Sequence, residues 1–487
     1  MASEQVGYHY LIPSLRKIVY RDGFFNPSSP AVAAFAPGRL DVMGGIADYT
    51  GATVCEMPLA LGTAVTLQKR GDRQVVVRSY LSDGKYKQVA FNLDDFYGSG
   101  SLVPAESIRE KLVREDRWAL YLAGAFWVLA RQRHLSPRAL GASIACMSDL
   151  PAGAGLSSSA ALENATLMAI SHAYRLSIDA PEAAVLAQKI ENQVVGAACG
   201  IMDQMASMLG NADRLMLLKC QPHELIGHQK LPAALRLVGI FSGVKHSVAD
   251  GGYRKTRVAA FMAHAIIAHY GRLLGAQRDI FGGYLGNVSR RDYLRYLRRL
   301  LPVEMSGGQF IQRYGKTIDS ATHVDPATIY RVRAAGDHHV LEAHRVNQFI
   351  SRLKKETGQE DAGNFTRLGR LMLASHASYG HRAMLGAQET DWIVRRLLKF
   401  GPQRGFYGAK ITGGGQGGTV AVLCDQRASV TADLQFAADE YADEFGHPWL
   451  IVEGSGPGAA ELGTFAITST QEQAAGTIFG DAAAEIP

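Results

Sequence analysis

Cysteine is scarce in this chain of 487 residues, and no cysteine motif is present. The five cysteines are Cys55, Cys146, Cys199, Cys220 and Cys424. They are scattered and odd in number, and no two of them form a Cys-x-x-Cys pair. Zinc sites and disulfide frameworks depend on such closely spaced sets, so neither is indicated. We expect buried, reduced thiols instead.

Long apolar runs and a strong excess of charge are missing as well. No apolar stretch approaches the roughly 20 residues that a membrane-spanning helix needs, and the first residues lack the basic and then apolar pattern of a signal peptide. The net charge of +6 suits an anionic cosubstrate but is too small to indicate nucleic-acid binding. We therefore expect a cytoplasmic protein without membrane or nucleic-acid partners, whose oligomeric state the sequence does not indicate.

The chain is longer than one usual domain, and its 47% of hydrophobic residues are enough for two cores. We expect two domains with a cleft between them and a boundary near Pro222, which divides residues 1–222 from residues 223–487. Alternation and short apolar runs predict strands over residues 31–36, 55–67, 74–79, 143–147, 215–218 and 235–241. Helical spacing predicts helices over residues 118–131, 158–174 and 180–192.

The most informative segment is residues 150–161, Leu-Pro-Ala-Gly-Ala-Gly-Leu-Ser-Ser-Ser-Ala-Ala. Small residues let backbone N–H groups close around an anion, and glycines allow a left-handed backbone. The N-terminus of the following helix adds a positive end. An alanine- and glycine-rich loop with a serine N-cap would have the same composition. We predict a phosphate-binding loop that opens a helix.

Two further glycine-rich segments stand far from this loop in the sequence. They are residues 36–51, Ala-Pro-Gly-Arg-Leu-Asp-Val-Met-Gly-Gly-Ile-Ala-Asp-Tyr-Thr-Gly, and residues 411–419, Ile-Thr-Gly-Gly-Gly-Gln-Gly-Gly-Thr. In this order the three segments resemble the motifs of the GHMP small-molecule kinases, the family of galactokinase, homoserine kinase, mevalonate kinase and phosphomevalonate kinase. Residues 199–204, Cys-Gly-Ile-Met-Asp-Gln, and residues 243–247, Gly-Val-Lys-His-Ser, narrow the resemblance to sugar kinases of the galactokinase and L-arabinokinase type.

The resemblance, which runs from about residue 35 to residue 465, implies an α+β fold of two domains. An S5-like α/β domain is expected at the N-terminus and a ferredoxin-like domain at the C-terminus. Residues 253–373 read as mostly helical and include an insertion around residues 262–345 that a compact galactokinase does not need. Residues 408–465 predict the order strand, glycine loop, strand, helix, strand, and residues 470–487 a loosely held tail.

Two segments of the helical region invite specific interpretations. The basic run of residues 289–300 predicts a solvated amphipathic helix with Leu294, Leu297 and Leu300 along its apolar side. Gly315-Lys316-Thr317 resembles the end of a nucleotide-binding P-loop. Six residues lie between the preceding Gly308 and Gly315, whereas that motif has four residues between its glycines, so we discard this interpretation.

The resemblance also implies roles for the residues that transfer the phosphoryl group from ATP. Asp203 would accept the proton of the sugar hydroxyl, and Arg39 would keep Asp203 ionised and stabilise the transferring charge. Ser159 and Glu191 would supply hard oxygen ligands to Mg²⁺. From residue type alone, a helical aspartate or glutamate is a surface residue and an arginine in a turn braces structure.

Further positions are expected to hold the nucleotide. The residues expected to contact the phosphates are Gly153, Gly155, Leu156, Ser157, Ser158 and Ser159. Gly414 and Gly415 belong to the third motif, whose missing side chains make room for the phosphate loop and the sugar. Trp118 matches a family aromatic near adenine, and a core tryptophan is an equal alternative.

The substrate prediction comes from a departure within the first motif. Galactokinase has Glu-His-Thr-Asp where this chain has Gly45-Ile46-Ala47-Asp48, so the polar pair that grips the hexose 6-hydroxyl is gone. L-Arabinose has the ring stereochemistry of D-galactose but lacks the hydroxymethyl group. Ile46 can fill that volume, whereas an unpaired glutamate there would cost about 1–3 kcal/mol of desolvation. Asp48, the Gly200 backbone and Tyr253 remain as contacts to the ring hydroxyls.

We therefore predict a sugar 1-kinase that uses Mg-ATP to phosphorylate the anomeric hydroxyl of L-arabinose. D-galactose, a uronic acid or a heptose are alternative substrates. A non-catalytic sugar sensor is an alternative of another class, against which the intact serine run and Asp203 stand. We also expect that restoring the pair by Gly45→Glu with Ile46→His narrows the preference for L-arabinose over D-galactose.

Overall fold

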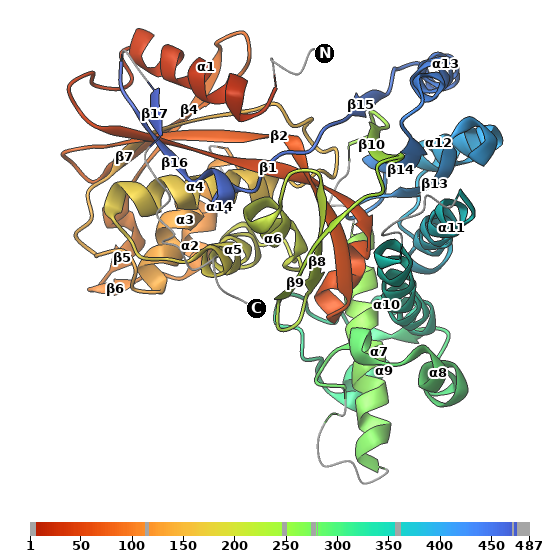
Figure 1. The fold of residues 1–487 in the computed structure, drawn as a ribbon. Coiled ribbons are helices and arrows are strands. Elements are labelled where there is room, and N and C mark those ends of the chain that lie inside the picture. The colour runs from red at the N-terminus through yellow and green to blue at the C-terminus, as the bar shows by residue number, and fades with distance from the viewer. Residues whose placement is uncertain are drawn as a thin grey trace.

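A computed structural model describes residues 6–112, 116–245, 251–273, 279, 281–355, 362–469 and 472–474, the last three by their backbone. His246 and Ser247, and the expected tail except for residues 472–474, lie outside the described residues. The described part contains two large sheets, each with its own helices (Figure 1). Among these residues no helix is both long and apolar enough to cross a membrane.

The first sheet is built on two long strands, β1 (Ala31–Met43) and β2 (Thr53–Lys69). They pair antiparallel, with irregularities between Pro37 and Arg39 and between Asp41 and Met43. The strand predicted over residues 31–36 thus continues through the first motif and carries Arg39 within the sheet. Alternate residues of β1 face opposite cores, because successive side chains of a strand point to opposite faces.

The remaining strands of the first sheet come from both ends of the chain. The path is β17-β16-β1-β2-β7-β3-β4, and β8 and β9 extend the other end of β2. These strands are β3 (Gln74–Tyr80), β4 (Tyr86–Asn92), β7 (Ala142–Ser148), β8 (Arg214–Lys219), β9 (Glu224–Lys230), β16 (Thr464–Ile467) and β17 (Glu472–Ala474). β16 belongs by sequence to the predicted C-terminal unit of residues 223–487, yet it pairs with β1 of the first sheet.

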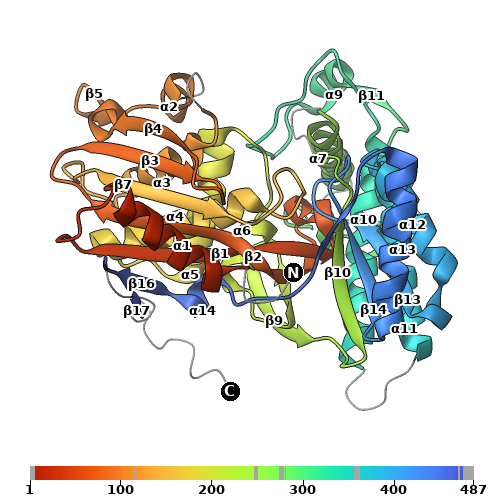
Figure 2. The same cartoon turned by 90° about the horizontal axis from the view of Figure 1, so that it is seen from above.

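Helices cover both faces of the first sheet (Figure 2). α1 (Tyr8–Arg21) lies on one face, with the side chains of Ala33 and Phe35 beneath it. The helices on the other face are α2 (Ala105–Leu112), α3 (Ala119–Arg131), α4 (Ser158–Tyr174), α5 (Ala180–Lys189) and α6 (Met202–Leu209). The predictions for α3 and α4 are confirmed to within one residue, and α5 is followed by a π turn over Ile190–Val195.

The second sheet is antiparallel and has the strand order β13-β14-β10-β15. Its strands are β10 (Leu235–Phe241), β13 (Phe406–Ile411), β14 (Thr419–Asp425) and β15 (Leu450–Val452). Its helices are α10 (Val332–Lys354), α11 (Ala362–Ser378), α12 (Gln388–Phe400) and α13 (Ala428–Phe445), whereas the short α14 (Ala459–Leu462) packs in the core of the first sheet. Leu40 and Val42 of β1 pack in one core with Leu235 and Leu237 of β10, which joins the two sheets.

The domain limits stay a prediction, and strand pairing bears on them directly. The boundary expected near Pro222 falls between β8 and β9, which pair with each other in the first sheet. Judged by strand pairing, the first sheet includes β9, which ends at Lys230, and it also includes β16, which begins at Thr464. The reason is that sheet membership depends on pairing between distant segments, which composition near Pro222 does not report.

The insertion is helical, as expected, but one of its segments differs from the prediction. α7 (Gly252–Leu273) and α9 (Gly307–Tyr314) are regular, whereas residues 290–300 form a short helical turn, a π turn and a 3-10 turn in succession. The predicted apolar side is confirmed for Leu297, which packs against the core, but not for Leu294, which is 45% exposed while Tyr293 is fully buried. The wide π turn shifts the phase of the side chains relative to a regular helix.

Candidate active site

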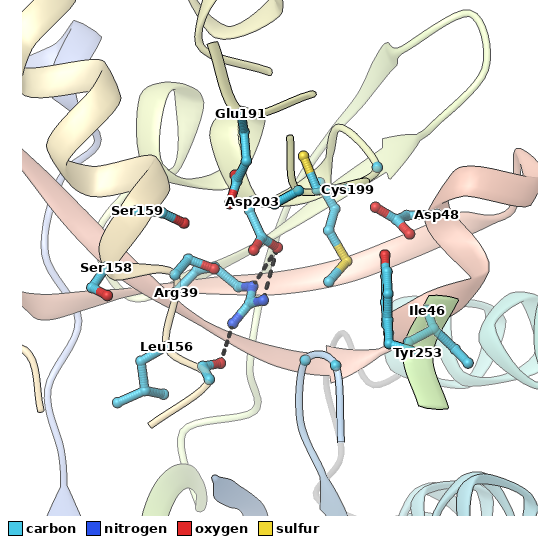
Figure 3. A pocket seen from close by; sticks show the side chains of 18 of the residues that line it. Arg39, Ile46, Asp48, Leu156, Ser158, Ser159, Glu191, Cys199, Asp203 and Tyr253 are labelled. Atoms are coloured by element: carbon cyan, nitrogen blue, oxygen red, sulfur yellow. Dashed lines mark hydrogen bonds and ion pairs between the residues drawn. The ribbon is translucent and has the colours of Figure 1, made fainter. Parts of the chain in front are cut away.

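A cavity of about 290 Å³ lies where the phosphate loop, the first motif and the glycine loop meet (Figure 3). The predicted site residues that line it are Arg39, Gly45, Ile46, Asp48, Gly153, Gly155, Leu156, Ser157, Ser158, Ser159, Glu191, Gly200, Asp203, Tyr253 and Gly414. Figure 3 shows Arg39 and Asp203 between Ser158 and Ser159 on one side and Asp48 and Tyr253 on the other.

Two predicted residues are not among those that line this cavity. Trp118 precedes α3 and packs against the core of the first sheet, so its contact with adenine stays a prediction. The sequence-based prediction missed Tyr121, which lies in the first turn of α3 and lines the cavity. Gly415 packs against the segment that precedes α12. A Cβ at Gly415 would lie 2.5 Å from the Leu385 carbonyl oxygen.

The phosphate loop has the left-handed backbone that its sequence predicts. Gly153, Gly155 and Ser157 have φ angles of +72°, +71° and +60°. Ser157 is the residue before α4, and its buried hydroxyl has no hydrogen-bond partner among the described residues. A left-handed residue at every second position before a helix turns successive backbone N–H groups toward one point. The loop and the unpaired hydroxyl therefore fit an anion such as a nucleotide phosphate.

The glycine loop of residues 413–418 packs directly on the phosphate loop, as predicted. A Cβ at Gly413 would lie 3.0 Å from the Gly155 carbonyl oxygen, and one at Gly418 would lie 2.9 Å from that of Ala154. The Thr419 hydroxyl donates a hydrogen bond of 2.8 Å to the same Ala154 carbonyl. Glycine is required at both loop positions because of this close approach and their positive φ angles.

Arg39 and Asp203 form an ion pair at the centre of the cavity. The Arg39 Nη2 and Nε atoms lie 2.7 and 3.0 Å from Asp203 Oδ1, and Nη1 donates to the Gly155 carbonyl at 2.7 Å. Arg39 is only 2% exposed. Burial disfavours its charge, but Asp203, Glu56 and Asp41 together raise the pKa of Arg39 above its usual value. The guanidinium is thus a fixed positive charge that faces the Asp203 carboxylate.

Carboxylates gather on the side of Asp203 away from Arg39. The Gln204 side-chain amide donates to Glu191 at 2.9 Å and to Glu163 at 3.1 Å. Burial, followed by the charge of Asp203, raises the pKa of Glu191 to about 7, against hydrogen bonds that include one from Ser159. This excess of buried negative charge favours a cation, and Ser159 and Glu191 offer the oxygen atoms that Mg²⁺ prefers.

The fit to Mg²⁺ needs oxygen atoms from outside the protein. Among the described residues, no cluster of three or more His, Cys, Asp or Glu side chains is arranged to hold a metal ion. Mg²⁺ commonly takes one or two protein ligands and completes its shell with substrate phosphates and water. The pair of Ser159 and Glu191 beside the phosphate loop agrees with that mode of binding.

Asp48 forms the opposite end of the cavity. It is 3% exposed and accepts a hydrogen bond of 2.7 Å from the Tyr49 backbone. A Cβ at Gly200 would overlap the Asp48 carboxylate, so glycine is required there for packing. Burial, followed by the charge of Asp203, raises the pKa of Asp48 to about 7. Arg257 partly offsets this from behind, where its guanidinium pairs with Asp319 of the insertion at 2.8 Å.

A buried network behind the cavity was missed by the sequence analysis. Lys410 and Asp41 form an ion pair of 2.7 Å with no exposure of either side chain. Asp41 also accepts hydrogen bonds from the backbone N–H groups of Gly45 and Gly413. The signal was available, because both charged residues stand inside apolar strands next to motifs.

The structure opposes a glutamate at position 45, and the effect of Gly45→Glu with Ile46→His on the sugar preference stays a prediction. Gly45 has a φ of +31°, and a Cβ there would overlap the hydroxyl of Tyr379. Tyr379 lies between α11 and α12 and is fully buried. Tyr379 is distant from residue 45 in the sequence, so no local pattern reports this contact.

Three family descriptions match parts of the chain. They are the N-terminal domain of GHMP kinases over residues 121–211, the C-terminal domain of GHMP kinases over residues 353–443, and the galactokinase galactose-binding signature over residues 20–69. A crystal structure of Lactococcus lactis galactokinase complexed with galactose aligns with a TM-score of 0.69 and 22% identity, covering 94% of this chain and 100% of that one. The chain thus has the two-domain α+β fold of the GHMP kinases, as predicted.

Curated relatives agree with this class. The chain is 35% identical to the L-arabinokinase of Arabidopsis thaliana over 91% of its own length, and it spans about half, 47%, of that protein. It is 29% identical to a galactokinase of Pasteurella multocida, with 86% of this chain and 91% of that protein aligned. The chain belongs to the GHMP kinase family, in its galactokinase group.

Proposed function

We propose that the protein is an ATP-dependent sugar 1-kinase and that its substrate is L-arabinose. The observation that carries the proposal is the Arg39–Asp203 pair, which stands between the phosphate loop and the cavity end formed by Asp48. A base and a fixed cation at that point serve the transfer of a phosphoryl group to a hydroxyl. Similarity to galactokinases and to an L-arabinokinase supports the same reaction.

The chemistry follows from the contacts of these residues. The Asp203 carboxylate accepts the proton of the anomeric hydroxyl as that oxygen attacks the γ-phosphorus of ATP, and the bond between the γ-phosphorus and the bridging oxygen breaks to release ADP. Arg39, held by Asp203, Glu56 and the Gly155 carbonyl, stabilises the negative charge that passes between the reactants. Ser159 and Glu191 would hold Mg²⁺, which neutralises phosphate charge when the nucleotide is bound.

The choice of a pentose rests on the end of the cavity opposite the phosphate loop. Ile46 is 2% exposed and packs in one apolar cluster with Tyr49 and Val258. It offers no hydrogen-bonding side chain to a 6-hydroxyl, and residue 45 has none. An unpaired hydroxyl in such a place loses binding energy, which favours L-arabinose over D-galactose.

D-Galactose is the second candidate. The galactose-binding signature matches residues 20–69, a range that includes Gly45 and Ile46, and the Pasteurella relative is a galactokinase. Asp48, Gly200 and Tyr253 can serve the hydroxyl groups that the two sugars have in common. The reaction is the same for both sugars. They differ only in the hydroxymethyl group, which D-galactose has and L-arabinose lacks.

A panel of free sugars tests the proposal. We expect ATP-dependent ADP release with L-arabinose, a product phosphorylated at the anomeric carbon by NMR, and a kcat/KM about 30- to 1000-fold above that for D-galactose. Equal use of both sugars would remove the pentose assignment and leave the 1-kinase. If the protein is folded and binds ATP but releases no ADP with any of the sugars, the result would instead favour a sugar sensor.

A further inference from the structure

Tyr379 stands behind the part of the cavity that is proposed to select the sugar. Its hydroxyl accepts a hydrogen bond of 2.9 Å from the Ile46 backbone N–H and donates one of 3.1 Å to the Gly413 carbonyl. It thereby links the first motif to the glycine loop, two segments that both line the cavity. Tyr379 itself does not line the cavity and has no exposed surface.

The ring of Tyr379 is held firmly in this position. Lys410 Nζ lies 5.3 Å from the ring centroid, and His338 packs edge-on against the ring at 5.2 Å between centroids. Both Lys410 and His338 are fully buried. A side chain held on several sides cannot turn away cheaply, because well-packed interiors respond to added volume with strain.

The Tyr379 hydroxyl also occupies the space where a side chain at position 45 would begin. A Cβ at Gly45 would overlap this oxygen and would lie 2.7 Å from the Tyr379 Cζ and 2.9 Å from Asp41 Oδ2. A side chain at position 45 would thus point into the buried network and not into the cavity. With Tyr379 present, residue 45 must be glycine.

We infer that Tyr379 is a specificity-determining positioning residue: it excludes a side chain at position 45 and holds the Ile46 backbone, so that Ile46 closes the end of the sugar site. The identity of the sugar in this inference rests on the proposed function. The steric part, in which Tyr379 and Gly45 form a matched pair, does not depend on any substrate.

A double-mutant cycle on thermal stability tests the matched pair. The variants are Gly45→Ala, Tyr379→Phe and their combination, and unfolding temperatures are measured for the full chain. We expect Gly45→Ala to lower the unfolding temperature by at least about 3 °C more with Tyr379 intact than in the Tyr379→Phe background. The backbone strain of alanine at the Gly45 φ is the same in both backgrounds and cancels.

Tyr441→Phe is the matched control of this cycle. Tyr441 is also fully buried, and its hydroxyl donates a hydrogen bond of 2.6 Å to a backbone carbonyl, that of Ser242. We expect its combination with Gly45→Ala to be additive. Additive behaviour of the Tyr379 pair as well would overturn the inference. Should Tyr379→Phe fold poorly, Tyr379→Leu removes the same oxygen and gives the same readout.

Kinetics test the positioning role. Tyr379→Phe frees the Ile46 backbone, whereas Gly413 keeps its hydrogen bond to Asp41, so the effect should fall on the sugar and not on the nucleotide. We expect the KM for the preferred sugar to rise about 10-fold, as for one lost hydrogen bond, with the KM for ATP changed less than about twofold. We also expect a smaller preference for L-arabinose over D-galactose.

The outcomes separate the inference from the proposed function. A wild-type protein that uses both sugars equally contradicts the pentose proposal, and the stability cycle still decides the matched pair. A wild-type protein that prefers L-arabinose, together with a Tyr379→Phe variant of unchanged sugar KM, contradicts the positioning role. Tyr441→Phe should leave the KM values for the sugar and for ATP unchanged. If it raises the KM for the sugar as much as Tyr379→Phe does, the effect comes from a general loss of packing and not from the position of Ile46.

Discussion

Among single residues, Asp203 and Arg39 carry the proposed chemistry through one short contact. Arg39 is buried, whereas the Asp203 side chain is 24% exposed, so the carboxylate is the member of the pair that a substrate can reach. The guanidinium also binds the Gly155 carbonyl and thereby ties the pair to the phosphate loop. A change at Asp203 therefore separates proton transfer from nucleotide binding.

Asp203→Asn removes the proton acceptor and keeps nearly the same shape. We expect kcat to fall by at least about 100-fold with little change in the KM for ATP, as measured by ADP release. Asp179→Asn is the control, since Asp179 caps α5 through a hydrogen bond to the Glu182 backbone and asparagine caps equally well. A turnover of Asp203→Asn equal to that of the control would exclude Asp203 as the base.

Asp48 gives the site a pH dependence of defined sign. Its pKa rises from near 4 when unfolded to about 7 in the fold, so the folded state holds the proton more tightly between these values. The contribution of Asp48 to the free energy of unfolding therefore falls as pH rises from about 4 to 7, by at most about 1.4 kcal/mol per pH unit. Asp48→Asn should lack this part of the decline in denaturant unfolding curves. If the free energy of unfolding of the wild-type protein and of Asp48→Asn changes equally with pH, the pKa of Asp48 in the folded protein is not raised.

At the scale of elements, the glycine loop between β13 and β14 matters through what it touches. Its residues approach the phosphate loop so closely that two backbones are in contact, and Thr419 adds a hydrogen bond across the same gap. The loop thereby transmits the position of the second sheet to the residues that are proposed to hold ATP. A change in the shape of the glycine loop should therefore change the affinity for the nucleotide.

Gly418→Ala tests this contact against a glycine of the same backbone conformation. Gly418 has a φ of +76° and faces Ala154, whereas Gly446 has a φ of +73° and no described atom lies within 4 Å of a Cβ built there. We expect Gly446→Ala to cost only backbone strain of about 1 kcal/mol. Gly418→Ala should cost more and raise the KM for ATP about 10-fold. Equal effects of the two changes would mean that strain alone matters.

At the scale of the whole molecule, the two sheets meet at buried charges as well as at an apolar core. Lys410 of β13 pairs with Asp41 of β1, and neither side chain has any exposed surface. Asp41 in turn holds Gly45 and Gly413 on the two sides of the cavity. The relative position of the sheets and the shape of the site thus depend on this ion pair as well as on the apolar core that joins the sheets.

Lys410→Met keeps the volume and leaves the Asp41 charge without its partner. We expect a loss of about 3–5 kcal/mol in the free energy of unfolding, measured with denaturant, because an unpaired buried charge is costly. Lys85→Met is the control, since Lys85 is 81% exposed in its pair with Asp83 and should cost less than about 1 kcal/mol. A loss at Lys410 no larger than the loss at Lys85 would show that water reaches this pair.

Local chemistry let the sequence alone determine much of this protein. The left-handed phosphate loop, the helix from Ser158 to Tyr174 and the family are readable because glycine spacing and helical periodicity act over a few residues. The tertiary structure alone decided which distant residues meet. It placed β16 beside β1, buried Tyr293 in place of Leu294, and set the Tyr379 hydroxyl where a side chain of residue 45 would begin. The contacts of β16 with β1 and of Tyr379 with residue 45 join segments hundreds of residues apart, and steric fit between such segments leaves no periodic trace in either of them.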